Sequence, residues 1–286
     1  MELFRALAAL SEPPGSETIR LAEILDLGAV PGESEWSELF LFQLYPYASV
    51  YLGPEGQIGG EARDRIAGFW RALELEPPAE ADHLAVMLAF YAELLGLESA
   101  TESDDDRGRW RHVQRAFLNE HLLSWLPAYL VKLETLAAPF YDGWGRLLQR
   151  ALAEEQTRLG ATDVPPVHFA RCGPPADPRR DGAGAFLDFL LAPLASGLIV
   201  LRSDLERAAL DTGLAVRVAD RRFGLESLLA QDARAVLGWL SEETTDWSRR
   251  LDRSVLGDCV AVASWSRRAT ATASLMQSIR DDTPGS

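Results

Sequence analysis

Apolar side chains recur with the spacing of one helix face along the first half of the chain. Positions i, i+3, i+4 and i+7 are apolar in the segment that ends at Pro77-Pro78, and later segments repeat the pattern. These stripes lie at residues 66–73, 84–95, 110–121 and 141–152. Successive amphipathic helices with short connections favour antiparallel packing. The pattern therefore predicts an all-α helical bundle.

A short apolar run at residues 39–45 is ambiguous, because it fits either a buried strand or a buried helix. No second strand candidate lies nearby to pair with it. We therefore predict a helix for this segment as well.

The composition changes between Gly160 and Gly184, where prolines and glycines are concentrated. Proline removes amide donors and glycine raises backbone entropy, so this segment is expected to be an exposed linker. Helical stripes resume beyond it, at residues 186–190, 201–208 and 236–240. The predicted organisation is a helical domain over residues 1–159, a linker over 160–184 and a C-terminal helical extension over 185–286.

Charge, cysteine content and hydropathy limit the kinds of partner and the cellular compartment that we expect. The net charge of -15 argues against nucleic acid, because phosphate binding needs clustered Lys and Arg. Only Cys172 and Cys259 are present, without the spacing of a thiolate zinc site, which suits a reducing cytoplasm. No apolar run approaches the roughly 20 residues that span a bilayer, and the N-terminus lacks a signal-peptide pattern. We expect a cytoplasmic protein that does not insert stably into membranes.

Glu80 and His83 have the E-x-x-H spacing that places a carboxylate and an imidazole on one helix face. A di-metal site needs a second such pair, which the sequence lacks, so we expect no metal. An all-α metalloenzyme using Glu80, His83 and His121 remains an alternative. Asp82 is also suited to cap a helix that begins near Leu84. The common hydrolase, P-loop, Rossmann and zincin motifs are missing, and we predict that the chain is not an enzyme.

Between Pro46 and Gly53-Pro54, an extended or turn segment is expected in which Tyr47, Ser49 and Tyr51 alternate with apolar residues. In an extended segment Tyr47, Ser49 and Tyr51 would point to one side. A rigid loop that presents two phenols and a hydroxyl suits peptide recognition.

Further aromatic candidates lie on the predicted helices. His121 and Trp125 share one helix face, four residues apart, where a partly buried core contact is the alternative to a functional role. Trp70 and Tyr91 have the same two interpretations, core or binding surface.

Four short motifs, taken in order, resemble the TorD/DmsD/NarJ family of redox-enzyme maturation chaperones. They are Tyr47 to Leu52, Asp82-His83, His121 with Trp125, and Pro139-Phe140-Tyr141. The resemblance covers residues 36–158. Where the family typically has Glu-Pro-x-Asp-His, residues 79–83 read Ala-Glu-Ala-Asp-His, so the acid is displaced by one position and the proline is lost.

The resemblance implies an all-helical bundle of the TorD-like type and a chaperone without cofactors. Its partner would be the twin-arginine leader, and the body, of a molybdopterin oxidoreductase catalytic subunit, held in the cytoplasm until cofactor insertion is complete. Such a leader has two arginines and an apolar helix, so its receptor needs acidic groups beside an apolar groove. The expected client-binding residues are Tyr47, Ser49, Tyr51, Trp70, Glu80, Asp82, His83, Tyr91, His121 and Trp125. We expect a monomer or a homodimer, and a small-ligand sensor domain is a further alternative.

Overall fold

The computed structural model describes residues 1–282 except 29, 31, 54–55, 137 and 218–219. Helices make up most of this part, and its only β-type pairing is an isolated antiparallel bridge between Tyr47 and His83. The prediction of an all-α fold is confirmed. Residues 39–43 of the ambiguous apolar run are helical as predicted, within the π-helix η1 over Glu38–Gln43, and the helix ends before Leu44 and Tyr45.

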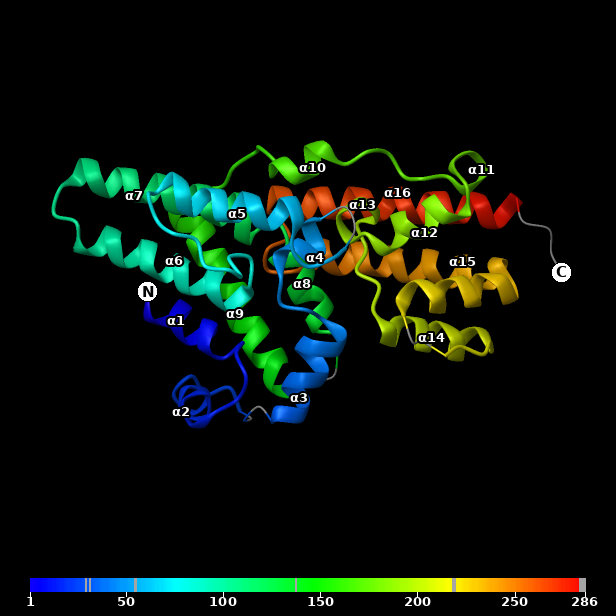
Figure 1. The fold of residues 1–286 in the computed structure, drawn as a ribbon, viewed down its shortest axis with the longest axis horizontal. Coiled ribbons are helices and arrows are strands. Elements are labelled where there is room, and N and C mark those ends of the chain that lie inside the picture. Colours follow the sequence, from blue (N-terminus) through cyan, green and yellow to red (C-terminus); the bar gives the residue numbers. More distant parts are fainter. Residues whose placement is uncertain (29, 31, 54–55, 137, 218–219, 283–286) are drawn as a thin grey trace.

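The first half of the chain supplies the helices on the left of Figure 1 and the short helices near its centre. Their bounds are α1 Glu2–Ala9, α2 Ser16–Ile24, α3 Glu33–Ser37, η1 Glu38–Gln43, α4 Ala48–Leu52, α5 Gly60–Ala72, α6 Leu84–Ala100, α7 Asp104–Phe117, η2 Leu118–Leu122, α8 Leu126–Leu133 and α9 Pro139–Leu159. The four predicted stripes fall on α5, α6, α7 with η2, and α9. Their apolar faces pack into one core.

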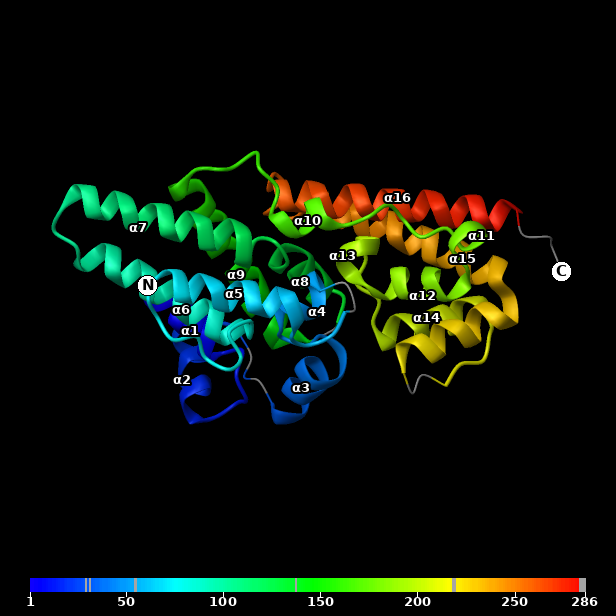
Figure 2. The same ribbon diagram turned by 45° about the horizontal axis from the view of Figure 1, so that its top comes forward.

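The second half begins with short helices and ends with two long ones. The bounds are α10 Val167–Arg171, α11 Pro178–Asp181, α12 Ala183–Leu191, α13 Pro193–Ser196, α14 Arg202–Thr212, α15 Arg221–Arg253 and α16 Val260–Asp282. α15 and α16 lie side by side along the right half of the molecule in both ribbon views (Figures 1 and 2). α15 is kinked at Asp232, where φ is -152° and ψ is 89°.

The segment at residues 160–184 differs from the exposed linker that its composition predicts. It contains α10 and α11, and the side chains of His168 and Phe169 are buried. Arg268 of α16 donates to the carbonyl oxygens of Phe169 and Cys172, both at 3.2 Å. The composition correctly predicted that the long helices are interrupted here. The segment is not a free linker, however, because several contacts hold it against α16.

The C-terminal extension packs against the first half through specific polar contacts. The indole N–H of Trp265 in α16 donates to the Ser124 carbonyl at 2.9 Å. The Lys132 ammonium in α8 lies 2.6 Å from the Asp204 carboxylate in α14, with both side chains almost completely buried. Buried apolar residues of both halves belong to one continuous cluster. The extension is therefore joined to the first half by a shared core, and the predicted domain boundaries stay a prediction.

Candidate functional site

Two chain segments meet at the candidate site, one before α4 and one before α6. The Ala48 N–H donates to the Asp82 carbonyl at 3.0 Å, and the Leu84 N–H donates to the Pro46 carbonyl at 2.8 Å. These bonds flank the Tyr47–His83 bridge. Pro46 favours an extended residue before the turn and cannot donate a hydrogen bond itself, which suits this pairing. The pairing fixes Tyr47 and His83 side by side.

The expected extended segment at Tyr47 to Tyr51 is wrong. Tyr47 is extended, but residues 48–52 form the helix α4. A helix turns successive side chains by about 100° rather than alternating them, so Ser49 and Tyr51 lie on opposite faces of α4. Ser49 is completely buried and its hydroxyl accepts from the Gly59 N–H at 2.9 Å.

Asp82 caps a helix, but a different one from the helix that the sequence suggested. His83, not Asp82, is the N-cap of α6. The Asp82 carboxylate accepts from the Ser49 N–H at 3.2 Å, at the start of α4. Only 1% of Asp82 is exposed. A carboxylate near a helix N-terminus satisfies a free amide and interacts favourably with the helix dipole, which accounts for its burial.

The surface over this junction carries a group that we call the acidic cluster: Glu12, Tyr47, Glu80, Asp82 and His83. The Tyr47 and His83 rings meet edge to face at 4.9 Å. His83 Nδ1 lies 3.5 Å from Glu12 Oε1. Burial, and then the nearby carboxylates of Glu80, Asp82 and Glu12, raise the pKa of Tyr47 to about 12. Tyr47 thus remains a neutral phenol in a negative environment.

Glu12 was missed from the sequence, since it follows α1 and belongs to none of the recognised motifs. The exposed carboxylates of the cluster are Glu12 and Glu80. Within the described residues neither forms an ion pair with Lys or Arg. In this part of the chain Glu12 contacts His83 and Glu80 interacts with Tyr47, and no Lys or Arg neutralises either carboxylate.

Tyr51, Trp125 and Tyr91 lie in the core. The Tyr51 and Trp125 rings stack at 5.4 Å with an interplanar angle of 10°. The Tyr51 hydroxyl donates to the Tyr45 carbonyl at 2.7 Å. The Tyr91 hydroxyl is 2.7 Å from the Glu155 carboxylate, and Tyr91 is completely buried. In this conformation these rings support the fold and offer a partner no free face.

His121 and Trp70 belong to a second aromatic group, separate from the acidic cluster. His121 contacts Phe69 and Phe117, and Trp70 stacks on Phe90 with ring centroids 3.8 Å apart. Burial lowers the pKa of His121 to about 3, with His168 and Arg65 opposing its charge as well. Trp70 is half-buried. A neutral, buried imidazole is typical of a core histidine.

The metalloenzyme alternative finds no support in this geometry. The described residues contain no group of three or more His, Cys, Asp or Glu side chains placed to hold a metal ion. Glu80 and His83 lie at the acidic cluster, whereas His121 packs among phenylalanines. E-x-x-H spacing did not produce a ligand pair, because Asp82 and His83 precede α6 instead of lying within it.

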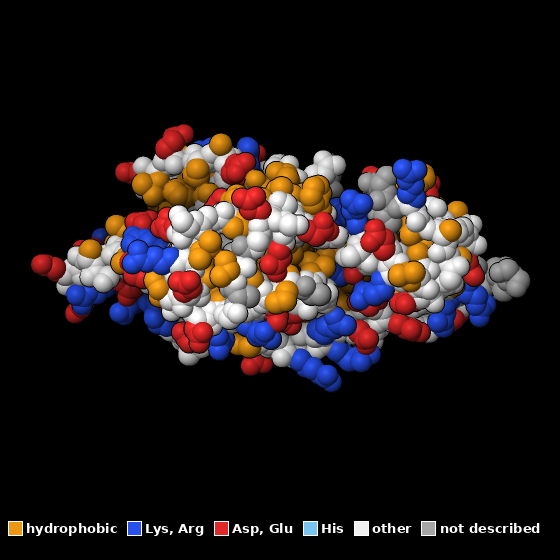
Figure 3. All heavy atoms as spheres, turned by 90° about the horizontal axis from the view of Figure 1, so that it is seen from below, with side chains coloured by type: hydrophobic (Ala, Val, Ile, Leu, Met, Phe, Trp, Pro, Cys, Tyr) orange, Lys and Arg blue, Asp and Glu red, His pale blue; other side chains and the backbone are white. Residues whose placement is uncertain are grey.

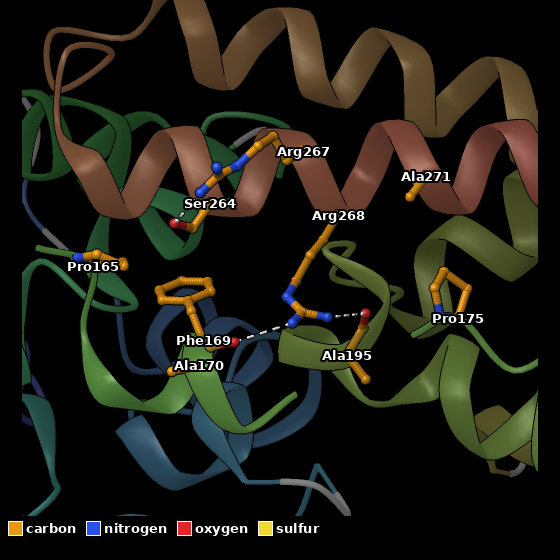
Figure 4. Close-up of a pocket in the computed structure, with 9 residues that line it drawn as sticks. All are labelled: Pro165, Phe169, Ala170, Pro175, Ala195, Ser264, Arg267, Arg268 and Ala271. Carbon is orange, nitrogen blue, oxygen red and sulfur yellow. Dashed lines mark hydrogen bonds between the residues drawn. The ribbon is translucent and has the colours of Figure 1, made fainter. Parts of the chain in front are cut away.

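The small-ligand alternative rests on the hollows of the surface. One hollow, of about 300 Å³, lies between α10, α13 and α16 (Figure 4). Arg268 points into its floor and donates to the carbonyls of Phe169 and Ala195, so its guanidinium joins helices of the protein. Nothing in this hollow favours a particular ligand.

None of the helices in the described ranges is long and apolar enough to cross a membrane. Fold and site together define an all-helical protein that presents a negatively charged, aromatic surface beside a buried helix cap.

Comparison with known proteins finds similarity to one family. Residues 16–130 match the family described as nitrate reductase delta subunit, a range that contains Tyr47, Glu80, Asp82 and His83. The similarity to TorD/NarJ-type chaperones that the motifs predicted is confirmed over this part of the chain. No solved structure gives a significant match.

Several curated relatives are named Chaperone protein TorD. The one from Vibrio vulnificus is 36% identical over 106 residues, which cover 35% of this chain and 46% of the relative. The one from Shewanella pealeana is 32% identical over 130 residues, covering 40% and 54%. The one from Aeromonas salmonicida is 29% identical over 137 residues, covering 46% and 63%. The chain thus spans about half the length of these relatives. Their names are those of chaperones, in agreement with the prediction of a non-enzymatic protein.

Proposed function

We propose that this protein is a cytoplasmic maturation chaperone that binds the twin-arginine leader of a molybdopterin oxidoreductase subunit before export. Two findings support the proposal. The matched family is named for a reductase subunit and the relatives are named as chaperones. The acidic cluster leaves two exposed carboxylates beside an aromatic ring without a Lys or Arg partner in the described residues.

The acidic cluster suits a pair of arginines in chemistry as well as in charge. A guanidinium forms charge-assisted, often bidentate hydrogen bonds with a carboxylate, and it also stacks on the face of an aromatic ring. Glu12 and Glu80 supply the carboxylates, and Tyr47 between them supplies the ring. The buried Asp82 adds negative charge behind them and fixes the backbone that carries Tyr47. The proposal rests on these residues. The buried rings of Tyr51, Tyr91 and Trp125 would contribute only by stabilising the fold.

A peptide titration tests the proposal. A fluorescently labelled leader peptide with two arginines is titrated with the full chain, next to the same peptide with two lysines. We expect tighter binding of the arginine form, because lysine cannot bind a carboxylate in a bidentate manner. The double variant Glu12→Gln, Glu80→Gln should weaken binding of the arginine peptide several-fold, since exposed pairs contribute about 0.2–1 kcal/mol each.

The matched control is Glu206→Gln, which removes an exposed carboxylate from α14. It should bind the arginine peptide like the wild type. Equal affinity of the two peptides, or equal losses in the control and in the double variant, would refute leader recognition by the acidic cluster.

Compartment and assembly state are further parts of the proposal. Both cysteines, Cys172 and Cys259, are free thiols, which suits the reducing cytoplasm. Fractionation of the cells that make the protein tests the compartment. Light scattering of the purified chain distinguishes the monomer from the homodimer.

A further inference from the structure

A cleft lies where the first half of the chain meets the extension. It has a volume of about 230 Å³ and is lined from the first half by Phe42 and Val50 and from the extension by Pro193, Ile199 and Arg221. A neighbouring hollow of about 540 Å³ shares Asp220 and Arg221 with it. Arg221 therefore stands between two adjoining depressions. The extension supplies one wall of each, and it lies beyond the residues that match the family.

The apolar surface next to this cleft is unusually exposed. Leu41 is 46% exposed, Phe42 is 52% exposed and Tyr45 is 38% exposed. These three residues lie within five positions of the chain. Leu41 and Phe42 belong to the π-helix η1, and π-helical turns are frequent at functional sites. Figure 3 shows hydrophobic side chains near the middle of the face seen from below, among acidic and basic side chains. A cluster of exposed apolar residues marks an interaction surface more often than scattered ones do.

Charged side chains of both signs line the cleft, namely Arg202, Asp220 and Arg221, with an excess of positive charge. Arg222, the neighbour of Arg221, forms an ion pair with Asp188. The Asp220 carboxylate accepts from the Phe223 N–H at 3.0 Å and so caps α15. Arg221 donates one hydrogen bond, to the Val200 carbonyl at 3.1 Å, and pairs with no carboxylate in the described part of the chain. A guanidinium has five N–H donors, so most of those on Arg221 are available.

We propose that this cleft binds a segment of a partner protein in which apolar side chains flank a carboxylate. The apolar side chains pack against Phe42, Val50 and Ile199, and the carboxylate pairs with Arg221. The cleft would thus attract an anionic group, although the chain as a whole has a net charge of -15 and attracts cations. This preference is also opposite to that of the acidic cluster, so a doubly cationic leader is a poor ligand here. The proposal stands whether or not the acidic cluster binds a leader.

A pair of model peptides tests the charge requirement. The first is a fluorescein-labelled peptide of alternating leucine, phenylalanine and glutamate, and the second has glutamine at each glutamate position. The full chain should bind the glutamate peptide roughly tenfold more tightly, as expected for a hydrogen-bonded charge pair. Arg221→Gln should abolish this preference. The matched control Arg249→Gln, an exposed arginine of the same helix that pairs with Asp246, should retain it.

A second variant tests the apolar wall. Phe42 is half exposed, so Phe42→Ser should leave the circular dichroism and the thermal midpoint nearly unchanged. It should weaken both peptides several-fold and keep their ratio. Equal binding of the two peptides by the wild type, no binding of either at millimolar concentration, or an unchanged preference in Arg221→Gln would overturn the proposal. Displacement of the glutamate peptide by a twin-arginine peptide would do so as well.

Discussion

Two regions of the molecule use carboxylates in opposite ways. At the junction of the two halves, Asp204 is buried against Lys132, and Arg207 bridges it to Glu243. At the acidic cluster, Glu12 and Glu80 lie in solvent without a Lys or Arg partner in the described chain. The charges of the junction are committed to the fold, whereas the proposed role of those at the cluster is binding. Variants at the two regions should therefore fail in different assays.

The largest effect is expected at the junction. Asp204→Ala leaves the Lys132 ammonium buried near the Trp247 ring without its carboxylate. Breaking a buried pair in this way costs about 3–5 kcal/mol of unfolding free energy. Urea denaturation followed by circular dichroism measures the loss. The double variant Lys132→Met, Asp204→Leu should recover part of it, because it removes both buried charges but still leaves the Leu201 N–H without its Asp204 acceptor.

Glu206→Gln, on the same helix but exposed, is the matched control and should stay within about 0.5 kcal/mol of the wild type. If Asp204→Ala unfolds at the same urea concentration as this control, the two halves do not depend on the buried pair.

The next effect concerns the interior of the first half and depends on pH. The pKa of His121 is lowered to about 3, while an unfolded histidine titrates near pH 6.5. The unfolded chain therefore binds the proton first as the pH falls. The stabilisation is complete above about pH 6.5 and is lost progressively toward pH 3. At pH 4 the loss is on the order of 3 kcal/mol.

His121→Phe removes this titration from a site already lined by Phe69 and Phe117. Between pH 7 and pH 4.5 its urea midpoint should fall less than that of the wild type. His168, whose pKa burial lowers to about 4, keeps part of the acid sensitivity in both proteins. Parallel declines in the two proteins would show that His121 is already protonated or solvated in the fold.

Asp82 connects the two uses of charge, because it is buried like Asp204 yet belongs to the acidic cluster. Asp82→Ala removes the acceptor of the Ser49 N–H and should cost about 1–2 kcal/mol, the usual range for a lost helix cap. Asp82→Asn keeps an acceptor oxygen and should cost less. The leader affinity of Asp82→Asn, measured by peptide titration, then isolates the contribution of the charge. An Asp82→Ala variant as stable as the wild type would contradict the capping role.

The sequence predicted the helices better than it predicted the site. Each apolar stripe is a local pattern, and α5, α6 and α9 formed where the stripes lie. Helical periodicity does not distinguish a ring in the core from one at the rim, so Tyr91 and Trp125 were counted as binding residues. The Asp82 cap joins residues 33 positions apart, and no local spacing reveals such a partner. Glu12 could not be predicted either, because the packing of distant segments brings it next to His83.

The smallest effect separates the ring of Tyr47 from its hydroxyl. The phenol lies among carboxylates and interacts with Glu80, so Tyr47→Phe frees Glu80 for the partner while it keeps the aromatic face. These changes oppose each other, and we expect the affinity for the arginine leader to change by less than about twofold. Tyr47→Leu removes the ring and with it a cation–π contact of about 0.5–1 kcal/mol, which corresponds to a two- to fivefold loss. Fluorescence anisotropy with the labelled leader resolves the two variants. If Tyr47→Phe loses as much affinity as Tyr47→Leu, the hydroxyl binds the leader directly, and the neutral phenol belongs with the exposed carboxylates as a polar contact of the acidic cluster.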